Sequence, residues 1–128
     1  MKILLDTHIL LWAVANSSSL SDRARELLED DTNELYYSAV SLTEISLKHL
    51  VHPEVIGMTS EAAKSRFDEA GYREFPYDSR VVKALDVMPL LHRDPFDRML
   101  LAQAIANGLK IMSHDKQFPA YGDFVISV

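Results

Sequence analysis

The sequence lacks cysteine altogether, which excludes disulfide bonds, thiolate nucleophiles and thiolate metal ligands. It also lacks the glycine patterns that bind phosphate or dinucleotides and the Gly-x-Ser-x-Gly turn of serine hydrolases, so those enzyme classes have no support. No apolar run approaches the roughly 20 residues needed to span a bilayer. Lysine and arginine (13) are outnumbered by aspartate and glutamate (19), and the net charge of −6 argues against a broad basic surface for nucleic acid.

The composition is otherwise that of an ordinary globular protein, with 48% apolar and 25% charged residues. A length of 128 residues is enough for one core, and no repeat or flexible linker divides the chain, so we expect a single domain over residues 1–128. Asp6 and His8 interrupt the N-terminal apolar run, which argues against a signal peptide. We therefore expect a cytoplasmic protein.

Short apolar segments alternate along the chain with segments of helical periodicity. The expected strands are 2–5, 34–40, 73–77, 109–112 and 124–126. The expected helices begin at capping side chains, which are Thr7, Ser21, Ser41, Thr59 or Ser60, Asp78 and Asp94. Strands that alternate with helices predict an α/β fold of three layers, in which helices flank a central parallel sheet of about five strands.

Four carboxylates follow this pattern in a regular way. Asp6 ends the first strand, Glu44 lies in the first turn after the second, Asp97 lies in the first turn of the helix before the fourth, and Asp115 follows the fourth. In a parallel α/β sheet the carboxyl ends of the strands and the starts of the following helices share one edge, where ligands bind. The sequence predicts that these acids meet there, although it leaves open which helix of each consecutive pair begins at that edge.

Helix geometry assigns different roles to two neighbouring aspartates. Asp94 is expected to be the N-cap of the helix that Asn107-Gly108 ends, with Pro95 as its first residue. Asp97 is then the third helical residue, where the helix dipole and the unpaired backbone N–H groups favour a carboxylate. We expect Asp94 to cap the helix and Asp97 to serve the functional site.

Other polar and aromatic residues have structural interpretations that compete with a functional one. Glu44 has two, a capping box with Ser41 or a surface ion pair with Lys48. His92 and His114 lie near the predicted edge and are interpreted as solvated loop residues. Residues 9–14 are apolar nearly all round, so their helix is expected to be buried or part of an interface, and Trp12 is assigned to the core.

Carboxylates that converge without a counter-ion repel one another, and a divalent cation relieves that repulsion. Oxygen ligands without cysteine suit Mg²⁺ or Mn²⁺ better than zinc. Such a centre polarises a phosphate and produces hydroxide from bound water, so phosphodiester hydrolysis is the reaction that this pattern favours.

Five short motifs give the chain a resemblance to the PIN-domain ribonucleases and, within them, to the VapC-type toxins of bacterial toxin–antitoxin pairs. The motifs are Leu-Leu-Asp-Thr-His (4–8), Ser-Ala-Val-Ser-Leu-Thr-Glu-Ile (38–45), His-Arg-Asp-Pro-Phe-Asp-Arg (92–98), Ala-Gln-Ala (102–104) and Ser-His-Asp (113–115). They occur in the family's order and extend over nearly the whole chain. The segment 53–78 carries no motif, and substrate selection is a candidate role for it.

The resemblance implies a PIN-like fold and an endoribonuclease that depends on Mg²⁺ or Mn²⁺. It implies that the catalytic and metal-binding residues are Asp6, Glu44, Asp97 and Asp115, and that their supporting residues are Thr7, Ser113 and Asp94. Arg93 and Arg98 are the expected contacts to the RNA substrate. The resemblance also implies a homodimer and an antitoxin protein that covers the site.

Two other functional classes are weighed against this one. A phosphoacceptor receiver is also a five-stranded α/β domain of this size, but it needs adjacent acids after its first strand and an aspartate at the end of its third. Here a single acid ends the first strand, and Pro76-Tyr77 ends the third. A PIN-like module that only binds is the second alternative, and a metal-dependent cleavage assay separates it from a nuclease.

Overall fold

The computed structural model describes all 128 residues, and its centre is a five-stranded sheet in which all neighbouring strands are parallel. The strands lie in the order β3-β2-β1-β4-β5. Their bounds are β1 Lys2–Leu5, β2 Glu34–Ser38, β3 Arg73–Phe75, β4 Lys110–Ser113 and β5 Val125–Ser127. The predicted α/β fold is confirmed, and each strand lies within two residues of its predicted bounds.

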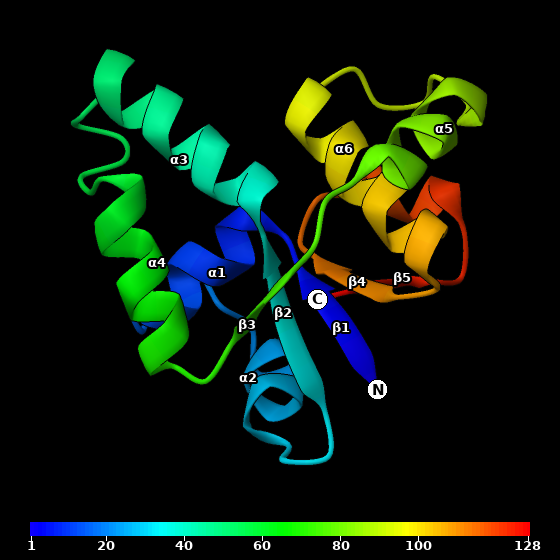
Figure 1. Ribbon diagram of the computed structural model, residues 1–128. Coiled ribbons are helices and arrows are strands. Elements are labelled where there is room, and N and C mark those ends of the chain that lie inside the picture. Colours follow the sequence, from blue (N-terminus) through cyan, green and yellow to red (C-terminus); the bar gives the residue numbers. More distant parts are fainter.

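Helices cover both faces of this sheet, as Figure 1 shows. Their bounds are α1 Thr7–Val14, α2 Asp22–Glu29, α3 Ala39–Val51, α4 Ser60–Glu69, α5 Ser79–Val87, α6 Pro95–Asn107 and a 3-10 turn, η1, at Phe118–Tyr121. The side chains of α1 to α4 pack mainly on one face, and those of α5, α6 and η1 pack on the other. The three predicted layers are therefore present.

The central strand β1 is buried on both faces, which explains its uninterrupted apolar sequence. Ile3 and Leu5 belong to a core of 13 buried residues beneath α1 to α4. Leu4 points the other way, into a core of 12 buried residues beneath α5 and α6. Burial on both faces fixes β1 in the middle of the sheet, and Asp6 follows it directly.

Two helices begin earlier than their sequence predicts. The cap of α1 is Asp6, whose side chain accepts from the backbone N–H of Thr7, so Thr7 is the first helical residue rather than the cap. The cap of α3 is Ser38, whose hydroxyl accepts from the Val40 N–H at 3.0 Å. The predicted capping box of Ser41 with Glu44 is therefore wrong. The last residue of β2 caps α3 with no loop between them, which places Glu44 in the second helical turn.

The remaining helix ends follow the sequence. Side chains of Ser21, Thr59, Asp78 and Asp94 cap α2, α4, α5 and α6, as predicted. Gly108 ends α6 with φ of +64°, a left-handed conformation in which a side chain is strained. None of the helices combines the length and the apolar character that a membrane span requires.

The order of the strands places the ligand-binding crevice. Sheets of this kind bind ligands where the strand order reverses direction, and here that point lies between β1 and β4. The receiver alternative requires the order 2-1-3-4-5. The observed order differs from it, so the receiver interpretation is rejected on topology.

Candidate active site

The adjacent ends of β1 and β4 hold the first and last of the four predicted acids. Asp6 is buried, and its backbone N–H donates to the Met112 carbonyl of β4 at 3.0 Å. Its side chain accepts two further bonds, one from the Thr7 N–H at 2.7 Å and one from the Ser113 hydroxyl at 2.7 Å. The Ser113 oxygen in turn accepts from the Asp115 N–H at 3.0 Å. These bonds fix the two acidic segments relative to each other.

The helices α3 and α6 both begin at this edge, which answers the question that the sequence left open. The hydroxyl oxygens of Thr7 and Ser41 lie 2.8 Å apart in a buried hydrogen bond between α1 and α3. At the start of α6, Asp94 Oδ1 accepts from the Asp97 N–H at 3.1 Å. Asp94 is thus the N-cap and Asp97 the third helical residue, as the sequence predicts.

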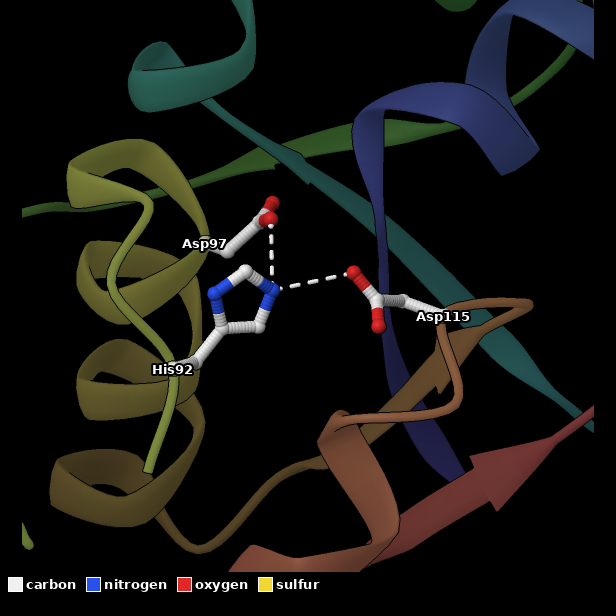
Figure 2. A group of neighbouring side chains, drawn as sticks. All are labelled: His92, Asp97 and Asp115. Carbon is white, nitrogen blue, oxygen red and sulfur yellow. Dashed lines mark hydrogen bonds and ion pairs between the residues drawn. The ribbon is translucent and has the colours of Figure 1, made fainter. Parts of the chain in front are cut away.

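A histidine joins the acids of α6 and β4, as Figure 2 shows. Nε2 of His92 lies 3.0 Å from Asp97 Oδ2 and 2.9 Å from Asp115 Oδ2. The ring is buried, with 7% of the residue exposed, and it also packs edge-on against Phe118. The interpretation of His92 as a solvated loop residue is therefore wrong, because carboxylates from two elements enclose its nitrogen.

The backbone determines which nitrogen of His92 carries the ring proton. The Asp94 N–H donates to Nδ1 at 3.1 Å, so Nδ1 acts there as an acceptor and the proton lies on Nε2. That N–H is directed at the carboxylates of Asp97 and Asp115. In this arrangement His92 is a hydrogen-bond donor to both acids.

The loop that carries His92 is held by a tyrosine from η1. The Tyr121 hydroxyl accepts from the backbone N–H groups of Leu91 and His92, at 3.1 and 2.8 Å, and donates to the Pro89 carbonyl at 3.0 Å. Arg98 also donates to the Pro89 carbonyl at 3.0 Å and approaches the tyrosine oxygen at 3.3 Å. Arg98, which the sequence assigns to RNA, is thus engaged in holding this loop.

Glu44 lies on α3, and its side chain is only 4% exposed. Oε2 pairs with Nζ of Lys48, four residues later, so the predicted ion pair forms, but the carboxylate is buried and does not lie on the surface. Oε1 is buried and has no hydrogen-bond partner. A buried carboxylate oxygen without a partner is costly, and it points to a group that the protein chain does not itself provide.

The electrostatics of the site reflect the crowding of these acids. Burial raises the pKa of Asp6, and the charge of Glu44 raises it further. Burial also raises the pKa of Asp97 to about 7, with additional contributions from the charges of Asp6 and Asp94. Burial acts on Asp115 in the same direction, but hydrogen bonds from the Gln117 N–H and from His92 outweigh it and lower the pKa of Asp115.

The donor atoms at this edge fit a divalent cation. Ligand atoms of His92, Asp97 and Asp115 lie within 4.8 Å of one another. Glu44 is not part of this cluster, but its charge contributes to the raised pKa of Asp6 and of Asp97, and its Oε1 has no partner. The carboxylate oxygens of Asp97 and Asp115 are ligands of the kind that Mg²⁺ and Mn²⁺ prefer, and a cation would offset the negative charges that add to the effect of burial on the pKa of Asp97.

Two residues of the site escaped the sequence-based prediction. A lone histidine in a loop carries no periodic signal, and its burial follows only from the packing of the loop between α6 and η1. Tyr121 lies 29 residues from His92 in sequence, so nothing local connects them.

Gln103, quoted above only as part of a motif, is fully buried and donates to the carbonyls of Phe75 and Pro76 at 3.1 and 3.0 Å. Arg93 is exposed.

Comparisons with known proteins bear on the family and the fold of the chain. The family model for the PIN domain matches residues 3–123 of the chain. No curated protein matches the sequence.

Solved structures share the fold at low sequence identity. A chain in the VapBC2 complex of Rickettsia felis, bound to a DNA fragment from its promoter, superposes with a TM-score of 0.70 at 16% identity, covering 100% of this chain and 98% of that one. A toxin–antitoxin complex from Klebsiella pneumoniae gives 0.66 at 15% identity, with coverage of 98% and 96%. FitAcB from Neisseria gonorrhoeae gives 0.63 at 19% identity, with coverage of 98% and 96%. At these identities the similarity establishes the fold.

Proposed function

The chain belongs to the PIN-domain family, and from this premise we propose that it is a divalent-metal-dependent endoribonuclease that acts as the toxin of a toxin–antitoxin pair. The observation that carries the proposal is the meeting of Asp97 and Asp115 at a single point, 3.0 and 2.9 Å from one nitrogen. Glu44 carries a buried oxygen without a partner, and its charge contributes to the raised pKa of Asp97. Mg²⁺ or Mn²⁺ is the ion class that suits such oxygens.

In the proposed site the four acids share one role, and neighbouring residues support them. Asp97, Asp115, Glu44 and Asp6 would hold the cation, which when bound stabilises negative charge on the phosphate and lowers the pKa of water. Thr7 and Ser113 position Asp6 by donating to its two oxygens. His92 keeps Asp97 and Asp115 apart at hydrogen-bonding distance. Lys48 neutralises one oxygen of Glu44 and leaves the other for the cation.

The toxin role and its partners are part of the proposal. The neighbouring structures include toxin–antitoxin complexes, which supports a cognate antitoxin as partner. Apolar side chains on the outer end of α3 and in the following loop are exposed, which suits burial against another protein chain, a second copy or an antitoxin. They are Leu47, Leu50, Val51 and Val55, between 49% and 76% exposed. The apolar residues of α1, which the sequence offered for this purpose, are buried or half-buried.

The test is cleavage of RNA by the purified protein, in Mg²⁺ or Mn²⁺ and in chelator. We expect internal cleavage with either metal, none in chelator, and a loss of at least a hundredfold for Asp115→Asn. Asp123→Asn is the matched control, because Asp123 is exposed and the same charge is removed outside the site. RNA that stays intact under every condition would contradict the nuclease proposal and favour the alternative of a PIN-like module that only binds.

A further inference from the structure

A second feature adjoins the acidic site and consists of aromatic rings. A cavity of about 250 Å³ is lined by Asp6 and Asp115 together with His8, Trp12 and His114. The indole of Trp12 stands between the two imidazoles, with ring centroids 5.8 Å from His8 and 5.6 Å from His114. The acids and the rings are walls of one cavity, so a ligand that reaches the acids also reaches the rings.

Two separate segments of the fold carry the three rings. His8 and Trp12 lie four residues apart on α1, one helical turn, directly after Asp6. His114 follows β4, and its Nδ1 is held by the Val128 carbonyl at 2.6 Å. Both histidines are exposed, and Trp12 is half-buried with part of its indole packed on the core. The assignment of Trp12 to the core is therefore only partly right, because the indole also lines the cavity.

The chemistry of this cavity favours a flat, polar aromatic ligand. Its only apolar side chain is the indole, and no aliphatic side chain lines it. Aromatic side chains beside a site for phosphate are the usual means by which proteins hold the bases of single-stranded RNA.

The cavity continues past the same rings. A neighbouring cavity of about 330 Å³ shares His8 and Trp12 and extends to Glu44 and Lys48. The indole is therefore a wall of both cavities, and it stands between the end with Asp115 and the end with Glu44. An RNA strand that extends from Asp115 to Glu44 would therefore also pass the indole.

We propose that His8, Trp12 and His114 form a stacking site for the nucleobase next to the phosphodiester that the acids cleave. This inference rests on the proposed ribonuclease function and adds to it a base-binding subsite with Trp12 at its centre. Stacking on a ring depends on the presence of a base more than on its identity, so the site holds the strand in place with weak sequence preference.

Trp12 is the only tryptophan of the chain, so its fluorescence reports on this site alone. The Asp97→Asn variant, which is expected to bind without cleaving, is titrated with a short labelled single-stranded RNA while anisotropy and tryptophan fluorescence are recorded together. We expect quenching that saturates with the same Kd as the anisotropy. The cleavage position is first mapped with the unsubstituted protein. Each nucleotide of the RNA is then replaced in turn by an abasic one, and we expect the quenching to be lost only when the missing base is the one beside that position.

Two substitutions separate stacking from packing. Trp12→Phe keeps an aromatic face, and Trp12→Leu keeps bulk for the core but no face. We expect RNA affinity to fall on the order of tenfold for Trp12→Leu and less than threefold for Trp12→Phe, with no change for the exposed control Val87→Ala. Thermal melts confirm that each variant is folded at the assay temperature, and a leucine variant that unfolds is replaced by His114→Ala against His114→Phe.

The outcomes distinguish this inference from the function on which it rests. Anisotropy that reports binding while the fluorescence stays constant would overturn the stacking site and leave the ribonuclease intact. Quenching that survives an abasic nucleotide at every position would do the same. Absence of both binding and cleavage would instead remove the proposed function, and the subsite with it.

Discussion

Asp97→Asn is expected to abolish cleavage and at the same time to stabilise the protein when no metal is present. The pKa of this carboxyl is raised from 3.8 to about 7, chiefly by burial and then by the charges of Asp6 and Asp94. The folded protein therefore holds a proton that the unfolded chain releases. Asparagine has the shape of the protonated acid and never carries the charge.

The pH dependence follows from the direction of that shift. Because the folded pKa lies above the unfolded one, folding stability falls as the pH rises from about 4 to about 7, and the loss is nearly complete above pH 7. A difference of about three pH units corresponds to about 4 kcal/mol at most. The side chain of Asp97 is 18% exposed, so solvent screens only part of this cost. We expect Asp97→Asn to gain between about 1 and 4 kcal/mol at pH 8 and almost nothing at pH 4.

The assay is urea unfolding of both proteins in chelator at several pH values, followed by circular dichroism. Asp123→Asn is the matched control, because it removes the same charge at an exposed position outside the site, and Asp94→Asn, which keeps a good helix cap, is expected to change stability within about 1 kcal/mol. Adding Mn²⁺ should shift the difference in favour of wild type, which gains about 2.7 kcal/mol at a hundredfold excess over Kd. A difference between Asp97→Asn and wild type that is the same at pH 4 and pH 8 would refute the reasoning.

Three further predictions concern other parts of the molecule. Expression of the protein alone is expected to arrest growth, and Asp6→Asn should relieve the arrest; equal toxicity of the two at equal protein levels would mean that the arrest is not catalytic. Tyr121→Phe removes the hydroxyl that bridges the loop of His92, so cleavage should fall while the melting temperature drops by only a few degrees. Gln103→Leu removes two buried hydrogen bonds between α6 and the end of β3 and should cost about 1–3 kcal/mol in urea unfolding, with little effect on Mn²⁺ binding.

The fold could be predicted from the sequence because the local sequence patterns of the strands and helices agree with the topology. Apolar runs, capping side chains and the left-handed Gly108 mark nearly every element, and alternation of strands and helices leaves a parallel sheet as the natural solution. Boundaries failed only at α1 and α3, where a strand passes into a helix with no loop. There the capping residue is the last polar residue before the helix, one to three positions earlier than predicted.

The sequence predicted the roles of site residues where these follow from position in a helix. It missed residues whose roles depend on packing between distant segments. Asp94 and Asp97 have the predicted cap and first-turn positions because both are determined by the local sequence. The loop of His92 is held by Tyr121, and the indole of Trp12 contacts the ring of His114, which is 102 residues away in the sequence. No pattern within one segment contains those contacts.

The central proposal is that carboxylates from four separate segments bind divalent metal, and direct measurement of Mn²⁺ binding tests it. Electron paramagnetic resonance of Mn²⁺ titrated with protein reports the free ion, whose signal should disappear as wild type is added. Asp123→Asn should bind as wild type does, whereas Glu44→Gln and Asp97→Asn should each weaken binding at least tenfold. A free-ion signal that wild type leaves unchanged, or Asp97→Asn that binds Mn²⁺ as tightly as wild type, would contradict the claim.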